Sequence, residues 1–186
     1  RRFAEAGQWD LCRRILTAAG FDFERGRLDR STHPFTTQVG SHDVRLTIRL
    51  REDDLPSAVL TALHEGGHGL YDQGFMPTDR DSLLGESPSM GLHESQSRLW
   101  ENHIGRSRSF WNRWFPTIQA IFPEATSGLS GDTFFHVVTA VKRVSGRVNS
   151  DEVSYHLHIL LRYELERALI SGDLTVHDLP GAWNER

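Results

Sequence analysis

The clearest alternation of apolar and polar positions lies between His42 and Leu50. Apolar residues occupy every second position from Val44 onwards, and charged or hydroxyl side chains stand between them. Because successive side chains of a strand point to opposite faces, this pattern predicts a strand with one buried face. Residues 21–40, which precede it, are rich in turn-forming residues. We therefore expect an edge strand that follows a turn-rich connection.

The rest of the chain places apolar residues three and four positions apart, the spacing of helices with one buried side. This spacing predicts helices over residues 3–19, 53–73, 91–118, 134–144 and from 150 onwards. Asp53 or Asp54 is expected to cap the second helix, with Gly74 as its stop. Pro116 is expected to break or kink the third helix, because its ring removes a backbone donor.

The last predicted helix is long, and Ser150 is expected to cap it. Asp151 and Glu152 would lie in its first turn, where negative charge is favourable. Its apolar positions form one stripe that we expect to be buried: Val153, Leu157, Leu160, Leu161, Leu165 and Leu169. The chain is therefore predicted to be mainly α-helical with a short β-strand element.

The composition is that of an ordinary globular protein, because 38% of its 186 residues are hydrophobic and 25% are charged. A net charge of −4 argues against nucleic acid or an anionic membrane as a partner. No apolar run approaches the ~20 residues that a membrane-spanning helix needs. The single cysteine, Cys12, excludes an internal disulfide and fits a reducing compartment, so we expect a cytoplasmic protein.

The sequence His64-Glu65-Gly66-Gly67-His68 lies within the second predicted helix. Residues four positions apart share one helix face, so both imidazoles are able to bind one zinc ion. Glu65 would flank the metal as the general base of a zinc peptidase. The two glycines weaken a helix, and close approach of another segment to the metal side would explain them. The alternative is a helix that carries two histidines without a metal.

Two histidines leave a catalytic zinc ion short of a third protein ligand. The third histidine of the metzincins is absent, so a side chain from a second helix is needed. The candidates that follow the motif are Glu86, His93, Glu94, Glu101 and His103. Glu94 opens the next predicted helix, after a loop long enough to fold that helix back over the first. Glu101 lies two turns further on, where we expect an ordinary solvated helix charge.

Several motifs, in order along the chain, resemble those of the M32 carboxypeptidases, a family of thermostable bacterial and archaeal metallocarboxypeptidases. They are HPF at 33–35, D-x-R-x-T at 43–47, the zinc helix at 64–68, H-E-S-Q at 93–96 and a relative of I/V-R-x-x-A-D at 146–151. The resemblance covers essentially the whole chain. It implies that Glu94 is the third zinc ligand, and it suggests a homodimer.

The resemblance also implies that Arg147 binds the C-terminal carboxylate of the substrate, a role that suits the two-pronged guanidinium. Gly146 and Ser150 depart from the family pattern around it. Arg45, on the polar face of the predicted strand, is the second candidate. Family members are much longer, and the chain begins with Arg1 instead of Met. We therefore expect residues 1–186 to be a single catalytic-core segment without its N- and C-terminal parts.

The resulting hypothesis is a zinc-dependent metallocarboxypeptidase with a helical HExxH core and a short strand near the active site. His64, His68 and Glu94 would hold one zinc ion per chain, or cobalt or another divalent metal, and Glu65 would act as base. Its partners would be peptides with a free C-terminus. Two alternatives stay open: another HExxH peptidase, acting within chains or at the N-terminus, and a zinc-binding fragment that is catalytically incomplete.

Overall fold

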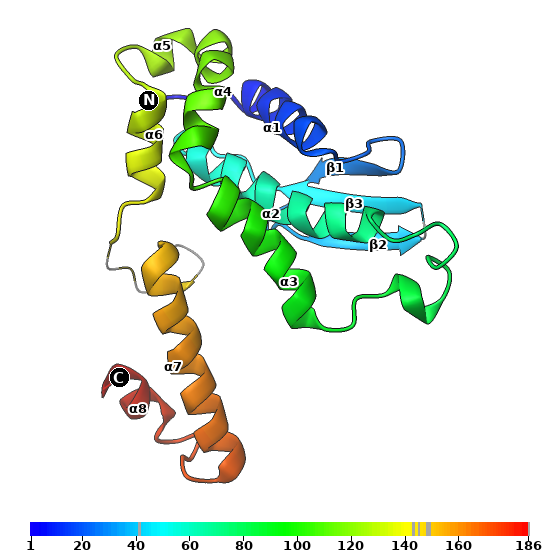
Figure 1. The fold of residues 1–186 in the computed structure, drawn as a ribbon. Coiled ribbons are helices and arrows are strands. Elements are labelled where there is room, and N and C mark those ends of the chain that lie inside the picture. Colours follow the sequence, from blue (N-terminus) through cyan, green and yellow to red (C-terminus); the bar gives the residue numbers. More distant parts are fainter. Residues whose placement is uncertain (41, 143, 145, 148–149, 186) are drawn as a thin grey trace. The chain divides into compact units, whose positions relative to one another are not determined.

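The computed structural model describes residues 1–40, 42–142, 144, 146–147 and 150–185. The chain forms two compact units, Arg1–His136 and Val137–Arg186, and each is described by itself. The first unit contains α1 (Glu5–Ala19), β1 (Gly26–Arg30), β2 (Thr36–Gly40), β3 (Asp43–Ile48), α2 (Leu55–Gln73), η1 (Leu83–Gly85), α3 (Met90–Arg98), η2 (Leu99–Ile104), α4 (Arg108–Ile121), α5 (Pro123–Thr126) and most of α6 (Gly131–Val138) (Figure 1). The second contains α7 (Glu152–Ser171) and α8 (Leu179–Glu185). The prediction of a mainly helical fold with a short β element is confirmed.

The small sheet has the strand order β1-β3-β2. Strand β3 confirms the strand predicted from the alternating pattern, but its predicted position at an edge is wrong. It lies in the centre, parallel to β1 and antiparallel to β2. Both partners come from residues 21–40, where only turns were expected. Four of the five residues of β2 are exposed, so this strand has no apolar face that a sequence pattern could reveal.

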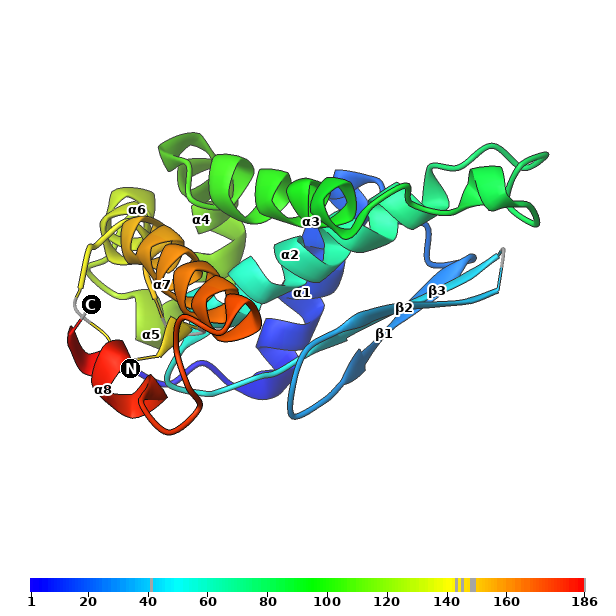
Figure 2. The ribbon, with the colours of Figure 1, turned by 90° about the horizontal axis from the view of Figure 1, so that it is seen from below.

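Helix α2 is the central element of the first unit. Figure 2 shows it between the sheet and α3. One core cluster joins α1, the sheet and α2, and its buried members are Cys12, Leu16, Phe21, Leu28, Val44, Leu46, Ile48, Ala58 and Ala62. The alternating apolar residues of β3 thus pack under α2, which places the HExxH helix directly on the sheet.

The two ends of α2 agree with the sequence. The carboxylate of Asp54 accepts a hydrogen bond of 3.1 Å from the backbone N–H of Ser57, and Pro56 lies in the first turn. The helix ends at Gln73, directly before Gly74. The predicted end of the first helix at residue 19 is also confirmed, because α1 ends at Ala19 and Gly20 after it has the left-handed φ of 102° that ends helices.

The third predicted helix is divided before Pro116, so the predicted break at this residue is wrong. Helix α4 continues through Pro116, and the chain turns earlier, between the π-helix η2 and the cap residue Ser107. Gly105 lies in this turn against α2. A Cβ atom there would lie 2.6 Å from Leu63 and 3.0 Å from Leu60, both on α2. Close packing on α2 and the cap therefore decide where the chain turns.

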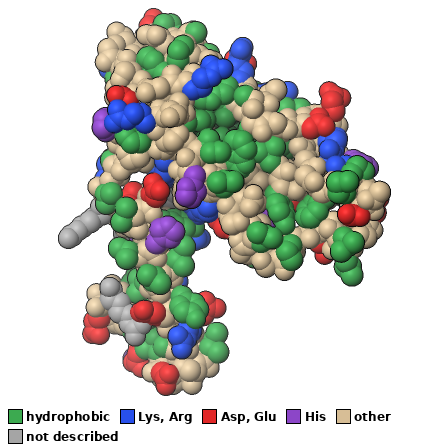
Figure 3. All heavy atoms as spheres, in the orientation of Figure 1, with side chains coloured by type: hydrophobic (Ala, Val, Ile, Leu, Met, Phe, Trp, Pro, Cys, Tyr) green, Lys and Arg blue, Asp and Glu red, His purple; other side chains and the backbone are tan. Residues whose placement is uncertain are grey.

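In the second unit, Asp151 instead of Ser150 caps α7, and its carboxylate accepts 2.9 Å hydrogen bonds from the N–H groups of Val153 and Ser154. The predicted buried stripe of α7 is wrong. Leu165 is buried, whereas Leu157 is 63% exposed, and Figure 3 shows hydrophobic side chains on the surface of this helix. Within the unit α7 packs against α8, a short helix that the sequence analysis missed and that covers part of its length.

The predicted helix over 134–144 lies earlier in the chain, as α6. Among the residues that the structure describes, no helix combines the length and apolar character that crossing a membrane requires.

The glycine at position 67 lets α3 approach α2 closely, as the sequence analysis proposed for the motif glycines. A Cβ atom at Gly67 would lie 2.6 Å from the carbonyl oxygen of Gln96 and 2.7 Å from the Cα of Ser97. These are backbone atoms, so no side-chain rotation relieves the contact. The two helices are therefore fixed at a spacing that only glycine permits.

We predict that Gly67→Ala lowers the free energy of unfolding by about 1–3 kcal/mol, because the overlap outweighs the better helix propensity of alanine. Urea denaturation measures the change. Gly91→Ala is the matched control, since Gly91 lies in α3 and the nearest atom to a Cβ at this position would be the Ser89 hydroxyl oxygen, 3.9 Å away. Equal stability of the two variants would contradict the prediction.

Candidate metal centre

Three side chains from α2 and α3 converge on one point. His64 and His68 lie one turn apart on α2, and Glu94 comes from α3. Their ligand atoms all lie within 4.8 Å of one another. Oε2 of Glu94 is 3.2 Å from Nε2 of His68 and 3.7 Å from Nε2 of His64. The structure thus brings together the three residues that the sequence analysis selected as ligands.

The spacing of these atoms fits a divalent metal ion. Two ligand atoms that each lie 2.0–2.1 Å from one tetrahedral zinc ion are about 3.3 Å apart, close to the two distances from Glu94 to the imidazoles. Two imidazoles and one carboxylate are also a donor set of catalytic zinc sites, which keep a fourth position open for water or substrate. His64, His68 and Glu94 are therefore able to hold such an ion with little rearrangement.

Glu65 lies next to this group on α2, and it is 6% exposed. Its Oε2 accepts a hydrogen bond of 2.6 Å from the hydroxyl of Thr36 on β2. A buried carboxylate is costly unless it is hydrogen-bonded, so this contact helps to accommodate Glu65. The residue predicted as base is thus held beside the metal group by a partner from the sheet.

Glu101 is a mostly buried support for His64, and the expectation of a solvated helix charge is wrong. Its side chain is 14% exposed, and Oε2 lies 2.8 Å from Nδ1 of His64. Arg98 and Arg106 bond the same carboxylate at 3.0 and 3.3 Å. A carboxylate that accepts the Nδ1 proton of a histidine leaves its Nε2 free to bind metal. One signal in the sequence could have indicated this role: Glu101 follows Glu94 by seven residues, or two helical turns, so both carboxylates lie on the same side of the chain.

His93, an alternative ligand in the sequence analysis, pairs with Asp72 instead. Its Nε2 lies 3.1 Å from Oδ1 of Asp72, and its ring lies 4.5 Å from the ring of His68. Asp72 follows His68 by four residues on α2, a spacing that could have revealed it. Nδ1 of His68 is buried, with no hydrogen-bond partner among the described residues. Glu86 and His103 are not part of the metal group.

Opposing effects set the protonation of the metal-free group. Burial acts to raise the pKa of Glu94, but its hydrogen bond with His68 and the charges of His64 and Arg98 outweigh burial and lower the pKa to about 2. Burial acts to lower the pKa of His64, and the hydrogen bond to Glu101 reverses this and raises it. The centre therefore favours an ionised Glu94 even without a metal ion.

The two arginines proposed for substrate binding lie in different units. Arg45 is on β3, and its Nη2 lies 2.6 Å from Oδ2 of Asp43, so its charge is shared with a neighbouring carboxylate. Arg147 is in the second unit, where its Nη1 donates a 2.7 Å hydrogen bond to the hydroxyl of Tyr155. The role of either arginine in substrate binding stays a prediction.

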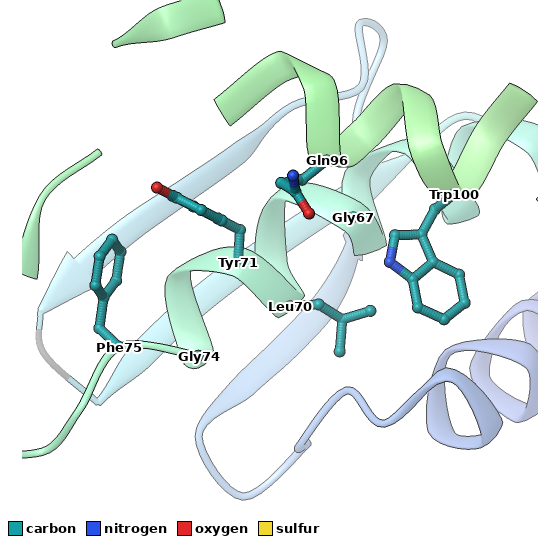
Figure 4. Close-up of a pocket in the computed structure, with 7 residues that line it drawn as sticks. All are labelled: Gly67, Leu70, Tyr71, Gly74, Phe75, Gln96 and Trp100. Atoms are coloured by element: carbon teal, nitrogen blue, oxygen red, sulfur yellow. The ribbon is translucent and has the colours of Figure 1, made fainter. Parts of the chain in front are cut away.

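A cavity of about 340 Å³ lies beside α2 and α3 (Figure 4). It is lined by Gly67, Leu70, Tyr71, Gly74, Phe75, Gln96 and Trp100. None of these residues belongs to the metal group. The cavity is therefore a feature separate from the three candidate ligands.

Comparisons with known proteins agree with this geometry. The model of the family described as Carboxypeptidase Taq (M32) metallopeptidase matches residues 1–186. Thermostable carboxypeptidase 1 of Thermus thermophilus is 46% identical over 172 residues, which are 92% of this chain and 34% of that protein. Carboxypeptidase 1 of Bacillus subtilis is 39% identical over 186 residues, or 37% of its length.

Solved structures show the same relationship. The crystal structure of the M32 carboxypeptidase from Deinococcus radiodurans matches with a TM-score of 0.96 and 44% identity, covering 98% of this chain and 37% of that one. The chain belongs to the M32 metallopeptidase family, because the family model spans all of it. The chain spans about a third of the length of the curated relatives it matches.

We predict that Glu101→Gln weakens zinc binding by about 10- to 100-fold, the usual cost of removing a carboxylate that supports a metal-binding histidine. Competition with a chelator measures the dissociation constant. Glu124→Gln is the control, because Glu124 is an exposed residue of α5. An unchanged affinity in Glu101→Gln would show that this carboxylate does not support the metal site.

We also predict that the metal-free protein loses stability as the pH falls from about 4.5 towards 2. The pKa of Glu94 is depressed in the folded state from its ordinary value of 4.5 to about 2, so its stabilising effect is present above 4.5 and lost on acidification. Urea denaturation at pH 5.5 and pH 3 compares the wild type with Glu94→Gln. The difference between them should shrink at pH 3, and a constant difference would contradict the assignment.

Proposed function

We propose that this chain is the catalytic core of a zinc-dependent carboxypeptidase that removes the C-terminal residue of peptides. The observation that carries the proposal is the convergence of His64, His68 and Glu94, with ligand atoms within 4.8 Å of one another, beside the buried carboxylate of Glu65. Membership of a metallopeptidase family whose named relatives are carboxypeptidases supports it. Those relatives are about three times longer than this chain, so the carboxypeptidase activity of the chain itself is part of what we propose.

A divalent metal ion at this centre would supply Lewis acidity for peptide hydrolysis. His64, His68 and Glu94 would hold it, and Glu101 would keep the imidazole of His64 oriented. Glu65 is the general base: its carboxylate accepts a proton from the attacking water and returns it to the leaving amine. Because Thr36 bonds Oε2 of Glu65, we assign the proton transfer to Oε1.

Selectivity for the C-terminus needs a fixed cation for the substrate carboxylate, and Arg147 is our first choice. The Tyr155 hydroxyl holds one of its nitrogens, and its guanidinium carbon lies 5.4 Å from the centre of the Tyr155 ring. These contacts restrict a long side chain before substrate binds. Arg45 is the second choice, because Asp43 already neutralises part of its charge.

Two other functions are distinguished by the same experiment. An endopeptidase or aminopeptidase with an HExxH centre would cleave peptides without a free C-terminus. A metal-binding core that is catalytically incomplete would bind zinc and cleave nothing. We further propose a cytoplasmic location, peptides as partners and a homodimer, in line with the resemblance to the M32 family.

The test is hydrolysis of a short peptide with a free C-terminus, compared with the same peptide amidated, by the zinc-reconstituted chain. We expect cleavage of the free peptide only, and a loss of about 10²- to 10⁴-fold in kcat for Glu65→Gln, the usual contribution of a general base. Zinc content is measured on the same samples. The matched control is Glu124→Gln.

Cleavage of the amidated peptide would favour another class of HExxH peptidase. One zinc ion per chain without turnover would identify an incomplete core. Full activity of Glu65→Gln would remove Glu65 from the mechanism, and the absence of zinc binding would overturn the metal centre.

A further inference from the structure

We propose that Thr36 is a positioning residue that fixes the carboxylate of Glu65 for proton transfer. This inference rests on the proposed function, since it needs Glu65 to act as base. It assigns a role in the reaction to the first residue of β2, a strand that the sequence pattern did not reveal.

The hydroxyl of Thr36 contacts Glu65 twice. Its Oγ1 lies 2.6 Å from Oε2 and 3.1 Å from the backbone carbonyl oxygen of Glu65. A hydroxyl carries one proton, and the shorter contact to the charged oxygen is the one that it donates to. A glutamate side chain has three rotatable bonds, so a short bond to one carboxylate oxygen fixes where the other oxygen points.

Thr36 is itself held in place by Thr47 of β3. The N–H of Phe35 donates to Oγ1 of Thr47 at 2.9 Å, and the N–H of Thr47 donates to the carbonyl of Phe35, also at 2.9 Å. The hydroxyl oxygen of Ser31 lies 2.7 Å from the same Thr47 hydroxyl. These hydrogen bonds attach the start of β2 to the central strand β3, and Thr36 is the residue directly after Phe35. The HPF and D-x-R-x-T segments are thus hydrogen-bonded to each other, and together they hold the threonine that contacts Glu65.

The neighbouring Thr37 shows what a threonine on this strand does without such a contact. Successive residues of a strand face opposite sides, and Thr37 is exposed while Thr36 is partly buried. Thr37 pairs with Arg45 in the β2–β3 ladder, one position along from the pair of Thr36 with Leu46. A change at Thr37 therefore alters the same strand without touching Glu65.

Thr36→Val removes the hydroxyl and keeps the shape, and Thr36→Ser keeps the hydroxyl. Each is crystallised, and its kcat, KM and zinc affinity are measured beside Thr37→Val and Glu65→Gln. In Thr36→Val we expect the Glu65 carboxylate to leave its position and kcat to fall about 10- to 100-fold. KM and zinc affinity should stay within twofold, Thr36→Ser should restore most of kcat, and Thr37→Val should match the wild type.

An unmoved Glu65 carboxylate in Thr36→Val would overturn the inference, and so would an unchanged kcat while Glu65→Gln is inactive. Neither result would affect the proposed function. Full activity of Glu65→Gln would overturn the proposed role of Glu65 and this inference with it. The crystal structures decide the positioning role even if the chain shows no turnover. Valine is favoured in strands, so we expect Thr36→Val to fold, and urea denaturation checks this.

Discussion

The candidate metal centre depends on how closely α3 approaches α2. Its candidate ligands come from both helices, and imidazole and carboxylate side chains have a fixed reach, so the backbones must lie near each other. At Gly67 the backbone of α3 occupies the space that a side chain would need, and at Gly105 the side chains of α2 do so. Two glycines, one on each side of the contact, thus set the spacing that lets Glu94 reach the histidines.

Charge holds the same contact together. Arg98 bonds the carboxylates of Glu94 and Glu101, both at 3.0 Å. Glu101 in turn bonds His64, so one arginine links a candidate ligand to the support of another. Partly buried charges are stable when they are paired in this way. The ion pairs of Arg98 lie within the α3–η2 segment and hold its two carboxylates in place, and the contacts of these carboxylates with His64 and His68 join the segment to α2.

Local features were predicted well from the sequence and tertiary ones less well. The HExxH spacing, the Asp54 cap and the Gly74 stop follow from a few neighbouring residues, so they could be identified directly. Strand β2 could not, because its side chains are mostly exposed and it exists through pairing with β3. The burial of Glu101 was missed for a similar reason, because its partner His64 comes from another helix, α2.

The π-helix η2 determines which side chains lie beside Glu101. A π turn holds one more residue than an α turn, and Glu101 lies inside such a segment, Leu99–Ile104. Residues five apart in an ordinary α-helix lie about 140° from each other around the axis, whereas a π turn brings them near one face, and Glu101 and Arg106 are five apart. Ordinary α winding over the same residues would therefore separate Arg106 from Glu101. In this segment the winding of the backbone thus decides which side chains meet, as much as the identity of the residues does.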